Sequence, residues 1–111
     1  MPSRGEVVYV PFFFTDRPKA MIRPAVVVST DAYHASRRDV IVAGITSNLS
    51  RSAFVGQALL EDWQACGLVS PSVVSGIVMT VRDDQLGRVL GVLSDADSAS
   101  LDKALGRTLG I

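Results

Sequence analysis

Two apolar runs rich in β-branched residues place the strongest constraint on how this chain folds. Residues 22–29 include the sequence Ala-Val-Val-Val, and residues 40–45 read Val-Ile-Val-Ala-Gly-Ile. β-Branched side chains pack well on a pleated surface, so a short continuous apolar run of this kind is typical of a buried strand. Polar and turn-forming residues separate the two runs. The sequence therefore predicts two buried strands that follow one another along the chain.

Polar side chains stand at one end of each run. Arg23 enters the first strand, while Thr46, Ser47 and Asn48 follow the second. If the two strands pair antiparallel through the connection at residues 30–39, these polar ends lie on the same side of the sheet. The sequence then predicts a guanidinium near a cluster of hydroxyl groups on a rigid apolar frame, which is a candidate site for an anion.

The rest of the chain reads as further short elements. Strands are expected at residues 6–12, 54–60, 72–81 and 86–93, and short helical segments at residues 31–36 and 61–65. The clearest helix begins after Ser94, a typical N-cap in a capping-box-like start with Asp97, and ends at Gly110. Many short strands with one terminal helix predict a mainly β fold, a small β-barrel with short α segments and the C-terminal helix packed on it.

Length and composition set the class of protein. A chain of 111 residues predicts one domain, residues 1–111. No apolar run approaches the roughly 20 residues that a membrane span needs, and residues 1–6 lack the apolar core of a signal peptide. The single cysteine, Cys66, cannot form an intramolecular disulfide and is expected to be a small core residue. These features predict a protein of the reducing cytoplasm with no membrane contact.

No metal or cofactor is expected from the residues. The spacing of Cys, His, Asp and Glu matches no metal-binding pattern. The single histidine, His34, lies in a short polar segment that is predicted to be helical, so its side chain is expected to be exposed to solvent.

The charge is unevenly distributed although its total is zero. Zero net charge argues against a protein that coats nucleic acid unspecifically. Residues 1–51, however, hold seven Lys or Arg against four acidic residues, a net charge of +3 for this part. Such a basic half could meet phosphates or an acidic peptide, although scattered arginines on a solvated surface give the same count.

Several segments, taken in order, resemble one family. Residues 4–12 read Arg-Gly-Glu-Val-Val-Tyr-Val-Pro-Phe, residues 23–29 read Arg-Pro-Ala-Val-Val-Val-Ser, and residues 45–47 read Ile-Thr-Ser. Leu-Glu-Asp-Trp at 60–63, Pro-Ser-Val-Val at 71–74 and Leu-Gly-Val-Leu-Ser-Asp at 90–95 continue the pattern. Their order and spacing resemble those of the MazF/PemK family of toxin endoribonucleases. The resemblance covers nearly the whole chain.

This resemblance implies a fold, an activity and partners. It implies an SH3-like barrel of the CcdB/MazF type and the toxic half of a type II toxin–antitoxin pair. It also implies metal-independent cleavage of single-stranded RNA, chiefly mRNA, through attack by the ribose 2′-hydroxyl. The expected protein partners are a cognate antitoxin and a second copy of the chain. A homodimer also agrees with the apolar residues 12–14 beside the basic half.

The family's functional residues carry over to particular positions. The arginine before Pro-Ala-Val-Val is Arg23, and the threonine after the third strand is Thr46. Arginine offers a permanently charged, bidentate fork for phosphate oxygens, and a threonine hydroxyl can donate to the same group. Asp16 is the candidate general base. The candidate RNA-binding residues are Thr15, Arg17 and Lys19 in the loop before the second strand, and Ser47 and Asn48 after the third.

One departure from the family pattern leaves alternatives open. Related proteins often carry charged residues directly after Pro-Ser-Val-Val, where this chain has Ser75, Gly76 and Ile77. Their absence favours a non-catalytic, antitoxin-binding module on the same fold as an alternative. A gyrase poison of the CcdB type is a further alternative, because the chain ends in Gly110-Ile111, but Leu109 replaces the tryptophan that would precede them.

Overall fold

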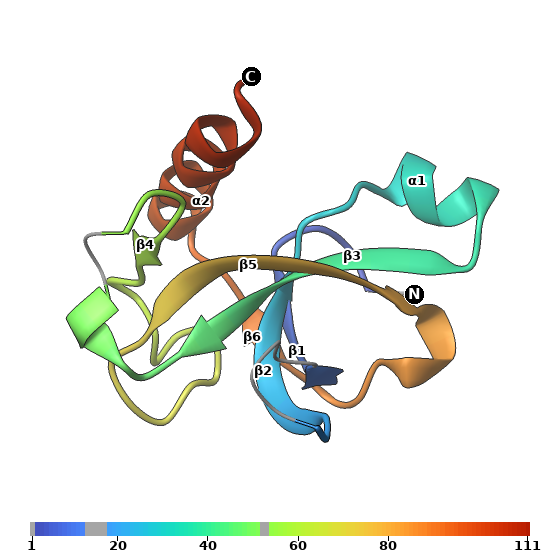
Figure 1. Ribbon diagram of the computed structural model, residues 1–111, viewed down its shortest axis with the longest axis horizontal. Coiled ribbons are helices and arrows are strands. Elements are labelled where there is room, and N and C mark those ends of the chain that lie inside the picture. The colour runs from blue at the N-terminus through green and yellow to red at the C-terminus, as the bar shows by residue number, and fades with distance from the viewer. Residues whose placement is uncertain (1, 13–17, 52–53) are drawn as a thin grey trace.

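A curled antiparallel sheet and a C-terminal helix make up the computed structural model (Figure 1), which describes residues 2–12, 18–51 and 54–111. The strands are β1 (Glu6–Phe12), β2 (Met21–Val27), β3 (Asp39–Thr46), β4 (Ala58–Leu59), β5 (Val73–Arg82) and β6 (Val89–Val92). The helices are α1 (Asp31–Ser36), α2 (Asp95–Leu109) and the 3₁₀ turns η1 (Leu49–Arg51) and η2 (Asp83–Gln85). The predicted mainly β fold with a C-terminal helix is confirmed.

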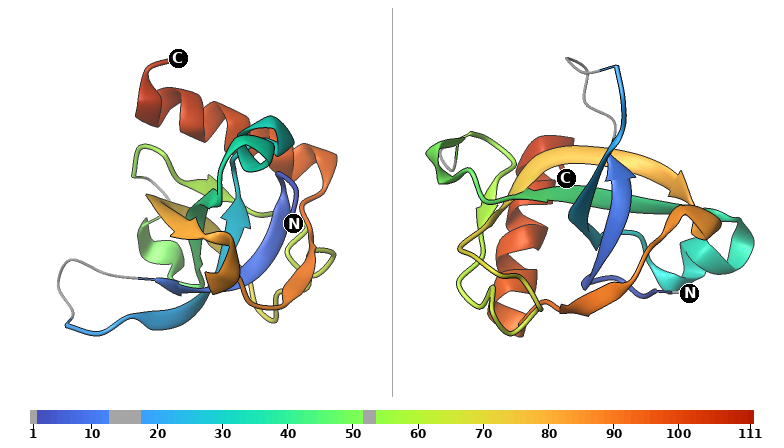
Figure 2. Two further views of the ribbon diagram at one scale, coloured as in Figure 1. Left: turned by 90° about the vertical axis from the view of Figure 1, so that its right-hand side faces the viewer. Right: turned by 90° about the horizontal axis from the view of Figure 1, so that it is seen from below.

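The six strands form one sheet in the order β4-β5-β3-β2-β1-β6, and every neighbouring pair is antiparallel. The sheet curls into a half-barrel (Figure 2). Helix α2 contacts β4 and β5, whereas α1 contacts β3, so the two helices lie over opposite ends of the long central strands (Figures 1 and 2). None of the described helices is long and apolar enough to cross a membrane.

Both faces of the central strands are buried. On one face, Val26, Ala43 and Val74 belong to an apolar cluster that includes Leu101 and Ala104 of α2. On the other face, Ala25, Val27 and Val42 belong to a second cluster with Val8, Val10, Phe12, Val40 and Val81. Residues on successive positions of a strand point to opposite faces, so burial on both faces requires an uninterrupted apolar run. This explains the runs at residues 22–29 and 40–45.

Two of the expected strands are shorter than their apolar patterns indicate. In the segment 54–60 only Ala58 and Leu59 pair with β5, because Gly56 adopts a positive φ of 89° that interrupts the extended backbone. In the segment 86–93 only Val89–Val92 form a strand, and residues 86–88 connect it to the turn η2. Phe12, considered for a dimer interface, is 1% exposed and belongs to the core.

Helix α2 has the predicted ends but an unpredicted anchor. The Ser94 hydroxyl accepts a hydrogen bond from the Asp97 backbone N–H at 3.2 Å, as an N-cap does. The Asp97 carboxylate, which is 1% exposed, accepts hydrogen bonds from the backbone N–H groups of Glu61 and Asp62, each at 2.9 Å. These two bonds hold the turn at residues 61–67 against the beginning of α2.

Asp97→Ala is expected to lower the free energy of unfolding by about 2–3 kcal/mol, because it removes two charge-assisted hydrogen bonds and leaves two backbone donors without a partner. The free energy of unfolding in urea measures this loss. Asp102→Ala is the matched control on the same helix, since Asp102 is exposed and pairs with Arg4 at the surface. We expect the control to lose less than about 1 kcal/mol. Equal losses in the two variants would contradict the anchoring role of Asp97.

Candidate functional site

The central strand pair places the predicted polar ends at one edge of the sheet. β2 and β3 are antiparallel, with the pairs Ala25–Gly44, Val26–Ala43 and Val27–Val42. This antiparallel pairing ends at Ala25–Gly44, so Arg23 of β2 and Thr46 of β3 both lie just beyond the paired segment, at the same end of it. The paired residues of β2, Ala25, Val26 and Val27, are fully buried. The two polar residues therefore stand at the end of a rigid apolar frame.

Arg23 presents an exposed guanidinium at this end of the sheet. Its backbone lies in β2 opposite Val10 of β1, and the following residue, Pro24, restricts it to an extended conformation. The guanidinium Nη2 contacts the Met21 Sδ atom at 3.7 Å, which is a weak interaction. No carboxylate of the described residues forms an ion pair with Arg23. Its donors are thus available to an anionic ligand.

The other basic residues of the N-terminal half are mostly neutralised. Three described arginines of residues 1–51 pair with carboxylates at N–O distances of 2.6–3.1 Å: Arg4 with Asp102, Arg37 with Asp39, and Arg38 with Asp83. The hydrogen bond from Arg38 lowers the pKa of Asp83 below its ordinary value. The net charge of +3 counted for residues 1–51 therefore does not correspond to a continuous basic surface. Arg23 differs from these paired arginines in that no described carboxylate neutralises it.

Thr46 is half-buried, and its hydroxyl oxygen already accepts one hydrogen bond within the protein. It ends β3, where it pairs with Val73 of β5. Its Oγ1 accepts a hydrogen bond from the Asn48 backbone N–H at 3.1 Å. Because this bond uses a lone pair of the oxygen, the hydroxyl proton is left to donate to another group. Thr46 can therefore act as a donor to an anion held by Arg23.

Three of the remaining predicted site residues have described side chains, and three do not. Lys19, Ser47 and Asn48 have exposed side chains, and Asn48 Oδ1 accepts hydrogen bonds from the backbone N–H and the hydroxyl of Ser50 at 3.2 and 2.6 Å. Three further candidates lie outside the described residues: Thr15, Asp16 and Arg17.

The segment that departs from the family pattern forms a bulge beside β3. The register between β3 and β5 shifts between Ala43 and Ile45, and the Ser75 hydroxyl there donates to the Gly44 carbonyl at 3.1 Å and accepts from the Ile77 N–H at 3.3 Å. Gly76 has a φ of 83°, and a Cβ atom at this position would lie 3.3 Å from the Gly56 backbone. A charged side chain at position 76 would thus be strained and crowded.

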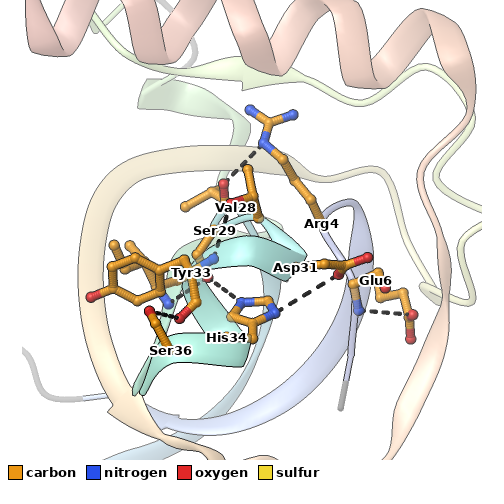
Figure 3. Close-up of polar contacts among 11 residues, drawn as sticks. Arg4, Glu6, Val28, Ser29, Asp31, Tyr33, His34 and Ser36 are labelled. Carbon is orange, nitrogen blue, oxygen red and sulfur yellow. Dashed lines mark hydrogen bonds and ion pairs between the residues drawn. The ribbon is translucent and has the colours of Figure 1, made fainter. Parts of the chain in front are cut away.

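His34 was predicted to be exposed, and that prediction is wrong. The residue is 7% exposed, and its Nε2 lies 2.5 Å from the Ser29 hydroxyl, which also accepts from the Ile41 N–H at 2.9 Å (Figure 3). Asp31 lies on its other side, 4.0 Å from Nδ1. This group joins α1 to the end of β2 that is remote from Arg23. The His34 side chain therefore has a structural role, because it fixes α1 against the chain that follows β2. A hydroxyl residue five positions before the histidine, Ser29, is the sequence feature that corresponds to this contact.

Cys66 is a core residue, as the sequence predicts. Its side chain is fully buried in the cluster beneath α2, and burial raises the pKa of its thiol. A thiol in this state is protonated and unreactive at neutral pH, so it is unsuited to act as a nucleophile. Among residues 2–12, 18–51 and 54–111, no three His, Cys, Asp or Glu side chains gather as a metal site would require.

Comparisons with solved structures identify proteins that share this fold. The fold is shared with an endoribonuclease of a mycobacterial species in complex with its cognate antitoxin (22% identity, 100% of this chain and 97% of that chain, TM-score 0.80). It is also shared with the Mycobacterium tuberculosis toxin MazF-mt6 (24% identity, 94% and 96%, TM-score 0.72) and the MazE–MazF complex of Deinococcus radiodurans (20% identity, 99% and 97%, TM-score 0.75).

No curated protein sequence matches the chain significantly. The model of the PemK-like, MazF-like toxins of type II toxin–antitoxin systems, however, matches residues 3–109, which is nearly the full length. The match includes the strands that carry Arg23 and Thr46. The chain therefore belongs to the PemK-like, MazF-like family of toxins of type II toxin–antitoxin systems.

Proposed function

We propose that this toxin is an endoribonuclease that cleaves single-stranded RNA, with mRNA as its cellular substrate. The observation that carries the proposal is the exposed Arg23 guanidinium, unpaired among the described residues, at the same end of the β2–β3 strand pair as Thr46. This pair suits a phosphodiester, since one residue supplies charge and the other a hydrogen-bond donor. Family membership supports the proposal, and one relative of the same fold is itself an endoribonuclease.

The proposed reaction is attack by the 2′-hydroxyl of the RNA on the adjacent phosphorus. A base removes the hydroxyl proton, the bond from the 2′-oxygen to phosphorus forms, and the bond to the 5′-oxygen breaks as that oxygen gains a proton. Arg23 binds the non-bridging oxygens, and Thr46 donates to the same phosphate. Asp16 is the base that we propose from the sequence. The products are a 2′,3′-cyclic phosphate and a 5′-hydroxyl.

The proposal includes the partners of the toxin. A cognate antitoxin would occupy the Arg23 end of the sheet with an acidic, extended segment and so compete with RNA. Family membership supports such a partner, as do the antitoxin complexes of two relatives with this fold. We also propose a homodimer, for which the exposed apolar side chains of Ile77 and Val78 on β5 are candidate contacts. The proposed location is the cytoplasm.

The decisive experiment is to incubate the purified toxin with a long single-stranded RNA. We expect fragments with 5′-hydroxyl ends, in the presence or absence of EDTA. A DNA of the same sequence, and an RNA with one 2′-deoxyribose 5′ to the scissile phosphate, should stay intact because the nucleophile is missing. The matched all-ribose RNA is the control for binding and sequence context.

The outcomes separate the proposal from its rivals. Cleavage of the single-deoxy RNA at the same phosphate, or complete inhibition by EDTA, would overturn the 2′-hydroxyl mechanism. Intact RNA together with tight binding of the antitoxin would indicate a non-catalytic module. Intact RNA together with DNA breaks in toxin-treated cells would indicate a gyrase poison.

A further inference from the structure

A short chain of hydrogen bonds follows the end of β3. The Asn48 backbone N–H donates to Thr46 Oγ1 at 3.1 Å, and Asn48 Oδ1 in turn accepts from the Ser50 backbone N–H at 3.2 Å and from the Ser50 hydroxyl at 2.6 Å. Asn48 immediately precedes η1, and Ser50 lies within that turn. Asn48 thus connects the Thr46 hydroxyl to a turn of regular backbone.

The first bond restricts the direction of the Thr46 hydroxyl. An alkyl hydroxyl has one proton and two acceptor sites, and its proton is free to rotate when no partner is fixed. An N–H group that donates to the oxygen occupies one acceptor site and disfavours proton positions that point at it. The hydroxyl proton is then directed away from the Asn48 N–H and is left to donate to a bound ligand. A donor oriented before the reaction stabilises developing charge without reorganisation.

The second set of bonds holds Asn48 in place. The Ser50 N–H is a donor only, so the amide atom that faces it must be the oxygen, which fixes the orientation of the Asn48 side chain. Its carbonyl oxygen accepts two hydrogen bonds and is therefore fully used within the loop. An asparagine side chain that binds backbone two residues later is a common way to stabilise a turn. The side-chain oxygen is consequently not available to read a base.

We propose that Asn48 is a positioning residue for Thr46, and that its side chain acts on the reaction through the loop instead of through contact with RNA. This inference rests on the proposed function and replaces the RNA-binding role expected from the sequence. The Asn48 side chain holds the segment 48–50, the held segment presents the Asn48 N–H, and that N–H orients the Thr46 hydroxyl.

A double-mutant cycle on RNA cleavage tests this coupling. We expect Asn48→Ala to lower the single-turnover cleavage rate at saturating RNA roughly tenfold, with little change in KM, because one orienting hydrogen bond is lost. In the Thr46→Ala background the same substitution should change the rate less than about twofold, since the hydroxyl it orients is absent. Circular dichroism spectra establish that each variant is folded at the assay temperature.

Two conservative variants distinguish positioning from RNA contact. Asn48→Asp keeps an oxygen that can accept from Ser50, so we expect it to recover most of the cleavage rate at saturating RNA. If the side chain instead touched the phosphate backbone, the added negative charge would make this variant worse than Asn48→Ala. Ser50→Ala removes one of the two donors to Oδ1 and should lower the rate in the same direction by a smaller factor.

The possible results divide the two proposals. Additive effects of Asn48→Ala and Thr46→Ala, or a rise in KM with an unchanged rate at saturation, would overturn the positioning role while leaving the endoribonuclease proposal intact. A wild-type toxin that cleaves no RNA would overturn both. Both proposals would be supported if Asn48→Ala lowers the cleavage rate only when Thr46 is present and Asn48→Asp recovers most of that rate.

Discussion

Arg23→Ala is expected to abolish RNA cleavage, with a loss of at least about a thousandfold in the cleavage rate. Arg23 is exposed and has no ion-pair partner in the part of the chain that the structure describes, so it is free to bind a phosphate. In the transition state the phosphate gains charge on its non-bridging oxygens, and the bidentate guanidinium stabilises that charge. Initial rates on a fluorogenic RNA measure the loss.

Two further variants sharpen the test of Arg23. Arg23→Lys should recover little activity, because an ammonium group cannot bind two oxygens in the planar geometry of the guanidinium. Arg82→Ala is the matched control, since the Arg82 backbone lies opposite Asp39 in the β3–β5 register, at the end of β3 remote from Thr46. It removes one exposed arginine and should leave the cleavage rate near that of the wild type. Wild-type activity in folded Arg23→Ala would refute the assignment of the site.

The sequence predicted those parts of the fold that depend on local patterns. The strands at the two β-branched runs, helix α1 and the ends of α2 are correct, because burial on both faces and side-chain capping leave signals within a few residues. Their antiparallel pairing follows from the short connection, and it puts Arg23 and Thr46 at the same end of the strand pair. The end of the sheet that holds the candidate site was therefore predictable.

Contacts between distant segments left no such signal. Asp97 was expected to complete a capping box, but its carboxylate binds backbone groups about 35 residues earlier in the chain. The burial of His34 depends on how α1 lies against β3, which no pattern in α1 reveals. Segments 54–60 and 86–93 are apolar enough for longer strands, but only β4 and β6 form in them, and the positive φ of Gly56 interrupts the first.

For Asn48, the sequence alone does not distinguish a role in binding RNA from a role in stabilising the loop. A polar residue after a strand can contact a ligand or stabilise the loop that follows, and both roles require the same amide group. The sequence places Asn48 beside Thr46, which made RNA contact the natural expectation. Only the two hydrogen bonds from Ser50 reveal that the side-chain oxygen is already used.

Thr46→Ala is expected to lower the cleavage rate by a factor of about 10²–10³, equivalent to about 3–4 kcal/mol of transition-state stabilisation. The Thr46 oxygen accepts a hydrogen bond from the Asn48 N–H, which leaves the hydroxyl proton to donate to a bound phosphate. A donor that strengthens as charge develops on the phosphate contributes to the rate more than to binding. Single-turnover kinetics should therefore show a large fall in the maximal rate and a small change in KM.

Thr46→Ser determines whether the hydroxyl or the methyl group of Thr46 is responsible. A serine hydroxyl can accept the same N–H and donate to the same phosphate, so we expect this variant to keep most of the activity. The loss of the methyl group removes packing at a half-buried position at the end of β3, and its cost should appear in the free energy of unfolding. Equal inactivity of the serine and alanine variants would mean that packing by the methyl group, and not hydrogen bonding by the hydroxyl, is what the site requires of Thr46.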